Sequence, residues 1–189
     1  MIRIGILGDI GSGKTYIAKK FGYPVFNADA EVAALYKKSR KCYNKLKKIL
    51  PNYISSFPVK KKELKRAISS NSSNLKKIIK IIHPEVRSKM KNFLKKNKNK
   101  KAVILDIPLF LENKINNKKD VIVFVDSKKK EIVKRLKKRK NFNKKLINKF
   151  RKIQLSLEYK KKKSQFIIRN NFSKKFLKKD INKILEKIL

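Results

Sequence analysis

The sequence predicts an α/β protein built on a five-stranded parallel sheet, and three observations support this. Short apolar runs of strand length alternate with helical patterns along the 189 residues. The runs at 102–105 and 121–125 are continuously apolar and rich in β-branched residues, as strands buried on both faces are. The first strand–helix–strand segment has so short a return that its two strands must lie parallel.

The first strand, residues 2–7, leads into a glycine-rich loop. From Gly8 to Thr15 the loop matches the phosphate-loop pattern G-x-x-x-x-G-K-[ST] at every fixed position. Its glycines allow several backbone N–H groups to point into one concavity, and a helix at 16–21 adds the positive end of its dipole. Lys14 would reach the outer phosphates of a ligand and Thr15 would offer its hydroxyl to Mg²⁺. The alternative is a glycine turn followed by a solvated lysine.

A helical block at residues 30–100 separates a short second strand, 24–26, from the third. It is longer than an ordinary crossover, and long insertions in α/β enzymes commonly form substrate-binding lobes. Within the block, Pro84 is predicted to end one amphipathic helix before another begins. The single histidine, His83, is expected to have a structural role, since a lone histidine is a poor metal site.

An aspartate follows each of three predicted strands. Asp106 resembles the acidic residue that assists magnesium in phosphate-loop proteins. Asp126 and Ser127 are expected to cap a helix at 128–139. Asp29 could accept the proton of an attacking hydroxyl at the carboxyl edge of the sheet, or cap a helix at 30–38, and position alone leaves both roles open.

Residues 140–164 are very basic, helical and poor in core residues, which predicts a small mobile lid. Arg135 and Arg139 lie one helical turn apart just before it, so they share a face. Lid closure would bring them to a transferred phosphate, and Arg139 is the better candidate because it is next to the lid. The alternative is a solvated basic helix. A fifth strand at 166–168 and a final amphipathic helix at 177–188 complete the chain.

The composition is strongly basic, with 55 Lys and Arg against 13 Asp and Glu and a net charge of +42. Such a charge suggests nucleic acid as a partner. However, the lysines and asparagines are spread along the whole chain, as an AT-rich genome would produce, so nucleic-acid binding is not expected. There is one cysteine, Cys42, which excludes a disulfide framework within the chain. No apolar run approaches the roughly 20 residues of a membrane span, and the chain begins with a strand rather than a signal peptide. A cytoplasmic protein is expected.

The chain resembles dephospho-CoA kinases from Met1 to about Asn170, on motifs that recur at matching distances. They are the phosphate loop, Asn27-Ala28-Asp29 where the family usually has Asp-Ala-Asp, Ile81-Ile82-His83-Pro84, the Asp106-Ile107-Pro108-Leu109-Phe110-Leu111-Glu112 segment, Arg135-Leu136-Lys137-Lys138-Arg139, and Gln154-Leu155-Ser156-Leu157 through Phe166-Ile167-Ile168-Arg169-Asn170.

The resemblance implies a three-layer P-loop kinase that transfers the γ-phosphate of ATP, with Mg²⁺, to the ribose 3′-hydroxyl of dephospho-CoA, the last step of coenzyme A synthesis. It implies Lys14, Asp29 and Arg139 as catalytic residues, with Asp29 as the base. Thr15 and Asp106 would hold the metal, and Asp29, Pro108, Leu109 and Glu112 the acceptor. ATP would be bound by Gly8, Gly11, Ser12, Gly13, Lys14, Thr15 and Tyr16.

The expected organisation is a single domain, 1–189, with a core of 1–29, 101–139 and 165–189, an acceptor-binding lobe of 30–100 and a lid of 140–164. A monomer or weak oligomer without membrane partners is expected. The chain departs from the family pattern at Asn27, Ala33, Ser156, Gln165 and Arg169. The other functions considered are a nucleoside or nucleotide kinase and a basic nucleic-acid-binding protein with a vestigial phosphate loop.

Overall fold

The computed structural model describes residues 1–138, 142–173 and 177–189. The chain divides into two compact units. The first combines Met1–Asn27 with Asn97–Leu189 and holds the sheet, whereas the second, Ala28–Lys96, is helical.

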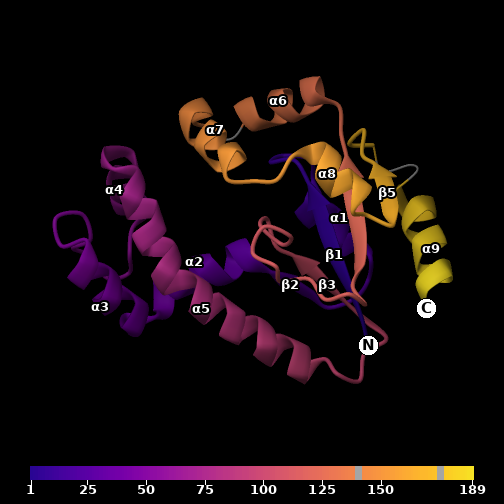
Figure 1. Cartoon of the computed structure of the whole chain (residues 1–189), viewed down its shortest axis with the longest axis horizontal. Helices are drawn as coiled ribbons and strands as arrows, with labels where there is room; N and C mark the ends of the chain where they lie inside the picture. Colours follow the sequence, from indigo (N-terminus) through magenta and orange to yellow (C-terminus); the bar gives the residue numbers. More distant parts are fainter. Residues whose placement is uncertain (139–141, 174–176) are drawn as a thin grey trace. The chain divides into compact units, whose positions relative to one another are not determined.

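The first unit is built on a parallel sheet of five strands in the order β2-β3-β1-β4-β5, which confirms the predicted fold class (Figure 1). The strands are β1 (Ile2–Gly8), β2 (Val25–Asn27), β3 (Ala102–Asp106), β4 (Val121–Asp126) and β5 (Phe166–Arg169). The register pairs Asn27 with Asp106 and Gly8 with Val125, so polar residues and the start of the loop meet at the carboxyl edge.

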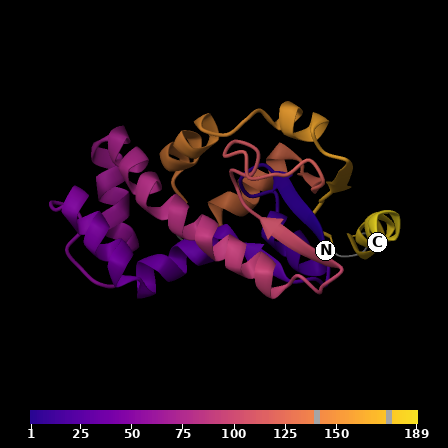
Figure 2. The same ribbon diagram turned by 60° about the horizontal axis from the view of Figure 1, so that its bottom comes forward.

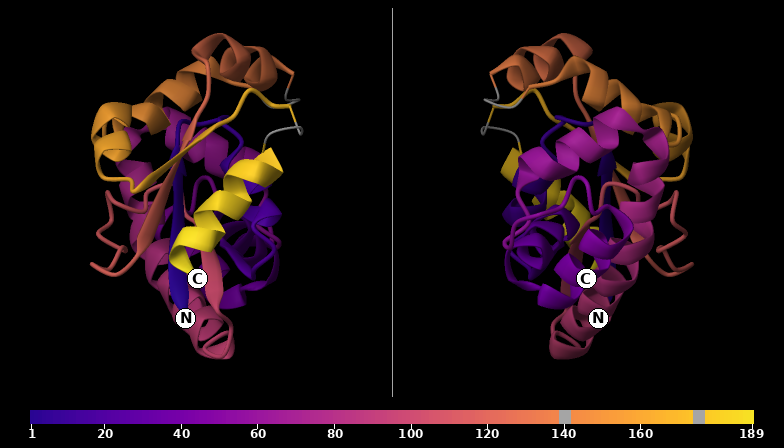
Figure 3. Two further views of the ribbon diagram at one scale, coloured as in Figure 1. Left: turned by 90° about the vertical axis from the view of Figure 1, so that its right-hand side faces the viewer. Right: turned by 90° about the vertical axis from the view of Figure 1, so that its left-hand side faces the viewer.

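The core of this unit explains why the strands are so apolar. Every residue of β3 is buried, as expected for a strand with neighbours on both sides. Helices α1 (Lys14–Lys20) and α9 (Leu177–Ile188) contribute Ile17, Ala18, Ile181 and Ile184 to the same cluster. Figure 3 shows α9, in yellow, running beside the strands.

Three further helices belong to the first unit. They are α6 (Lys129–Lys137), α7 (Lys144–Lys152) and α8 (Leu157–Lys162), and α6 and α7 lie beyond the carboxyl ends of the strands (Figures 1 and 3). The prediction that Asp126 and Ser127 cap α6 is wrong, because its N-cap is Lys128, without a side-chain hydrogen bond. The Ser127 hydroxyl instead donates to the carbonyl of Ser12 at 3.1 Å, so a tertiary partner replaced the local one.

The second unit contains α2 (Ala28–Lys38), α3 (Arg40–Ile49), α4 (Lys61–Ser70) and α5 (Ser72–Lys96), drawn from purple to magenta in Figure 2. Their apolar faces form a separate core that includes Leu35, Leu46, Ala67 and Ile78. Among the helices of the described residues, none is long and apolar enough to cross a bilayer.

The predicted break at Pro84 is wrong, because this proline lies inside α5, a continuous helix of 25 residues. A proline inside a helix costs about 3 kcal/mol, since it removes one hydrogen bond and crowds the preceding turn. Pro84 is exposed, whereas Ile82 before it and Val86 after it both pack on the core of the second unit. Continuous packing on both sides outweighs the local penalty.

A buried carboxylate, Glu63, organises the connection between α3 and α4. It is 2% exposed and accepts hydrogen bonds from the backbone N–H groups of Ser55, Ser56 and Lys60 and from both serine hydroxyls. Burial would raise the pKa of Glu63, but these donors outweigh it and lower the pKa to about 2. The folded state therefore holds Glu63 as a carboxylate.

We expect the Glu63→Gln variant to lose about 2 kcal/mol of unfolding free energy at pH 7, because one charge-assisted acceptor is lost. A lowered pKa stabilises the folded state above the unfolded value of 4.5, and this stabilisation is lost as the pH falls toward about 2. Urea unfolding at pH 7, 5 and 3 should show the two proteins converging at the lowest pH.

The matched control is Glu31→Gln, because Glu31 forms a partly exposed ion pair with Lys89 at 3.0 Å. This change should cost less than about 1 kcal/mol at every pH. A pH-independent difference between Glu63→Gln and the unsubstituted protein would contradict the role assigned to the Glu63 charge.

Candidate functional site

The glycines of the phosphate loop are required by its geometry. Gly8, Gly11 and Gly13 have φ angles of 145°, 91° and 93°, which side chains rarely adopt. A Cβ atom on Gly13 would lie 2.5 Å from the Asn170 amide nitrogen, and one on Gly8 would lie 2.6 Å from the Val125 carbonyl oxygen. The loop is therefore packed closely against the ends of β4 and β5.

Asn170, directly after β5, supports the phosphate loop through hydrogen bonds. Its Nδ2 donates to the Ser12 carbonyl at 2.8 Å in a buried position, and its backbone N–H donates to the Asp126 carbonyl at 2.7 Å. The sequence assigned no role to this residue beyond its place in the family motif. Its position directly after a strand, like that of the three aspartates, was the signal available.

Lys14 is the first residue of α1 and directly follows Gly13. Its ammonium group donates to the carbonyl oxygens of Gly8 and Asp9, at 3.1 and 2.8 Å, so the side chain folds back over the loop. Gly13 is the N-cap of α1 and no side chain caps that helix. The following Tyr16 is 40% exposed, and the ammonium group of Lys20 lies 5.5 Å from its ring centroid.

Thr15 and Asp106, the two residues predicted to bind magnesium, are brought together. The Thr15 hydroxyl donates to Asp106 Oδ2 at 2.6 Å, and the Asn27 amide donates to the same oxygen at 2.5 Å. The pairing of β2 with β3 places Asn27 opposite Asp106, which is 3% exposed. A hydroxyl and a carboxylate suit Mg²⁺, which is commonly bound by one or two protein oxygens together with phosphates and water. Within the described residues no group of three or more His, Cys, Asp or Glu side chains gathers to hold a metal ion.

A second carboxylate, Asp9, lies in the loop itself and pairs with Arg151 of α7. Arg151 donates through Nε to Oδ1 at 3.2 Å and through NH2 to Oδ2 at 2.8 Å. Asp9 Oδ1 also accepts the Ile10 N–H at 2.6 Å. Sequence reasoning missed both partners, although an acidic residue inside an anion-binding loop was a visible signal.

Glu112, predicted to line the acceptor site, lies in the turns after β3 and is tied to the start of α8. Its Oε1 is 2.8 Å from the ammonium group of Lys160, which is 1% exposed, and accepts the Leu155 N–H at 3.0 Å. Lys160 also donates to Gln154 at 2.9 Å. Within the described residues, the buried Glu112 Oε2 has no hydrogen-bond partner. Pro108 and Leu109 are half-buried in the same turns.

The predicted arginine pair is only partly described. The Arg135 guanidinium lies 4.3 Å from the ring centroid of Phe172, in a cation–π contact. Arg139 lies outside the described residues.

Asp29 belongs to the second unit and is exposed in the first turn of α2. Because α2 begins at Ala28, the alternative that Asp29 is the N-cap of the helix is wrong. A carboxylate in a first turn is nevertheless favourable to the helix dipole. His83 lies within α5, where burial and then the charge of Arg87 lower its pKa.

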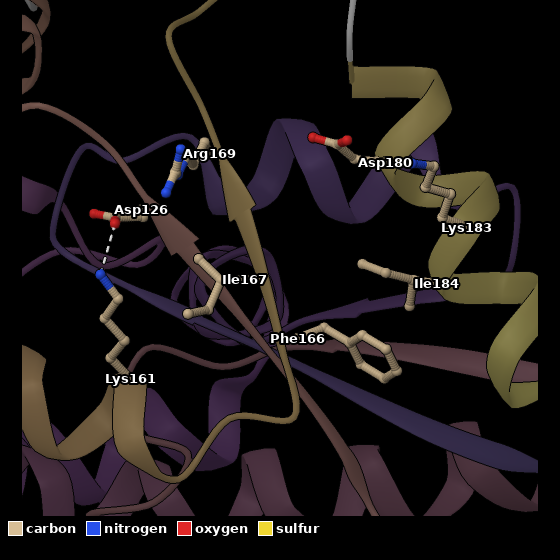
Figure 4. A pocket seen from close by; sticks show the side chains of 8 residues that line it. All are labelled: Asp126, Lys161, Phe166, Ile167, Arg169, Asp180, Lys183 and Ile184. Atoms are coloured by element: carbon tan, nitrogen blue, oxygen red, sulfur yellow. Dashed lines mark hydrogen bonds and ion pairs between the residues drawn. The ribbon is translucent and has the colours of Figure 1, made fainter.

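A surface pocket lies between β5 and α9 (Figure 4). None of its lining residues belongs to the phosphate loop, and Lys161 pairs with Asp126 there at 2.9 Å. Arg169, one of the departures from the family pattern, lines it. Another departure, Gln165, has a structural contact, because its side-chain oxygen accepts the Ile122 N–H at 2.7 Å.

Comparison with known proteins supplies the family. The family model described as dephospho-CoA kinase matches residues 2–175. The dephospho-CoA kinase of Wolbachia pipientis wMel is 31% identical over 190 residues, covering 98% of this chain and 97% of that protein. The corresponding protein of Fusobacterium nucleatum is 33% identical over 198 residues, with 98% and 97% coverage.

Solved structures agree in fold. TT1252 from Thermus thermophilus superposes with a TM-score of 0.80 at 27% identity, covering 100% of this chain and 98% of that one. The dephospho-CoA kinase from Campylobacter jejuni gives a TM-score of 0.63 at 22% identity, with 98% and 96% coverage, which bears on the fold alone. From the match over nearly its whole length to the family model and to these relatives, the chain belongs to the dephospho-CoA kinase family.

Proposed function

We propose that the protein catalyses ATP-dependent phosphorylation of the ribose 3′-hydroxyl of dephospho-CoA, giving coenzyme A and ADP. The observation that carries the proposal is the meeting of Thr15 and Asp106 beside the phosphate loop, in a chain of this family. Phosphoryl transfer asks little covalent chemistry of a protein, because positioning and charge neutralisation supply most of the catalysis. A formed loop with oxygen ligands at its edge is suited to both tasks.

The loop would bind the phosphates of ATP through the backbone from Gly11 to Tyr16. Thr15 and Asp106 would hold Mg²⁺, which when bound supplies neutralisation of the phosphate charge. The Thr15 hydroxyl and the Asn27 amide already converge on one Asp106 oxygen, which supports this pairing. Because Asn27 is neutral, Asp106 would be the carboxylate of this group.

Lys14 would exchange its two carbonyl partners for phosphate oxygens when ATP binds. Its ammonium group lies 2.8 Å from the Asp9 carbonyl of the same loop, at the end of a flexible four-carbon stem. In its new position it would stabilise the negative charge that develops on the transferred group. Arg139, next to the lid, would contribute a further positive charge.

Asp29 would accept the proton of the attacking hydroxyl as a general base. Asp29 follows Asn27 by two residues in the chain, and Asn27 contacts Asp106, which supports this role. Pro108, Leu109 and Glu112 would line the acceptor site, and the unpartnered Glu112 Oε2 supports a ligand contact there.

Replacing Lys14 by alanine should lower kcat by a factor of about 10³ or more, because a charge that stabilises the transition state is lost. Coupled detection of ADP with dephospho-CoA as acceptor would measure this. Lys19→Ala, an exposed lysine on the same helix, is the control and should stay within about threefold. Near-normal turnover by Lys14→Ala would exclude the loop as the ATP site. Turnover of a nucleoside panel in preference to dephospho-CoA would instead identify a nucleoside kinase.

The Asp29→Asn variant should lower kcat by about 10² or more while the KM for ATP changes little, because only the general base is removed. Steady-state kinetics with each substrate varied would test this. Glu31→Gln, also in the first turn of α2, is the matched control. A rise in the KM for ATP by the same factor as the fall in kcat would point to a structural role for Asp29.

The Glu112→Gln variant should raise the KM for dephospho-CoA about tenfold and leave the KM for ATP unchanged, if Glu112 accepts a hydrogen bond from the acceptor. Lys160→Met is the comparison, since it leaves Glu112 buried without its cation and should cost about 3 kcal/mol of stability. If Glu112→Gln raised the KM for dephospho-CoA and the KM for ATP by similar factors, Glu112 would have only a structural role.

A further inference from the structure

The phosphate loop, which would bind a negatively charged ligand, itself contains a negatively charged residue. Asp9 is the second residue of the loop and is 9% exposed. Its carboxylate accepts the Ile10 N–H, and its carbonyl accepts a hydrogen bond from the Lys14 ammonium group. An unneutralised carboxylate at this position would repel phosphates, most strongly where water is excluded.

Arg151 supplies the neutralising charge, and it comes from a different element, α7. The two N–H···O bonds at 3.2 and 2.8 Å engage both carboxylate oxygens, the bidentate geometry that arginine favours with carboxylates. The Arg151 side chain is 34% exposed and that of Asp9 is 12% exposed, so the pair is screened less than one on the open surface. The partners are 142 residues apart in sequence.

We propose that Arg151 is a positioning residue for ATP binding: it neutralises Asp9 and thereby keeps the loop able to accept a triphosphate. In this role Arg151 acts through Asp9 and does not contact the phosphates. The proposal rests on the proposed function, because it takes the loop to be the ATP site. It also makes the ATP affinity depend on the position of α7, since withdrawal of that helix would expose the Asp9 charge to the ligand.

The test is a double-mutant cycle with Arg151→Gln, Asp9→Asn and the double variant, each titrated calorimetrically with ATP, ADP and AMP in the presence of Mg²⁺. Arg151→Gln should weaken ATP binding about tenfold, ADP binding less and AMP binding least, because the repulsion grows with the ligand's charge. Asp9→Asn alone should tighten ATP binding, because Arg151 then keeps an uncompensated positive charge. The double variant should return to within about threefold of the unsubstituted protein. Lys152→Gln, the next residue of α7 and exposed, controls for the loss of one positive charge and should not change ATP binding.

Three results would overturn the proposal. A double variant as weak as Arg151→Gln would mean that Arg151 contacts the nucleotide directly. Equal losses for ATP and AMP would mean that the pair only maintains the fold, and no loss at all would leave Arg151 without a role in binding. If Arg151→Gln does not fold, the same cycle is run with Arg151→Lys, whose smaller loss should again be erased by Asp9→Asn. Failure of the proposed function is distinguishable, because the unsubstituted protein would then not bind ATP.

Discussion

The close packing of the phosphate loop against the ends of β4 and β5 is the constraint on which the site depends. Asn170 and the Val125 carbonyl occupy the space that side chains on Gly13 and Gly8 would need. The same Asn170 amide holds the Ser12 carbonyl, so the loop is supported as well as confined. Because interiors are packed to crystal-like density, this support gives the loop one shape. Thr15 at the start of α1 is thereby placed to meet Asp106 at the end of β3.

The charge of the molecule looks different at the surface and inside. Of 68 charged side chains, most are lysines on the outside, where water and salt screen them. The few acidic side chains include several that are buried and partnered: Glu112 with Lys160, Asp120 with Arg3, and Asp9 with Arg151. Burial raises the pKa of Asp120, which the Asn117 N–H and Arg3 oppose. Several of the few carboxylates in this protein therefore have structural roles or lie at the candidate site.

The interactions that stabilise each unit internally are different. The sheet unit is stabilised by its continuously apolar strands, which are buried on both faces of the sheet. The helical unit relies on a smaller core and on Glu63, which gathers the donors of a whole connection around one carboxylate. The Glu63 carboxylate thereby satisfies backbone N–H groups that the connection would otherwise bury without partners.

The sequence alone determined the strands, the phosphate loop and the family, because these depend on local patterns: apolar runs, glycine spacing and a lysine and hydroxyl at fixed offsets. It also predicted Thr15 and Asp106 as magnesium ligands, and the structure joins the two by a hydrogen bond. It failed at Pro84 and Ser127, where packing or a distant hydrogen-bond acceptor outweighed a local preference. Only the tertiary structure decided that Asn170 braces the loop and that Arg151 neutralises Asp9, because these contacts join residues 158 and 142 positions apart. No local propensity encodes such pairs, since they form only when the sheet has brought distant segments of the chain to the same place.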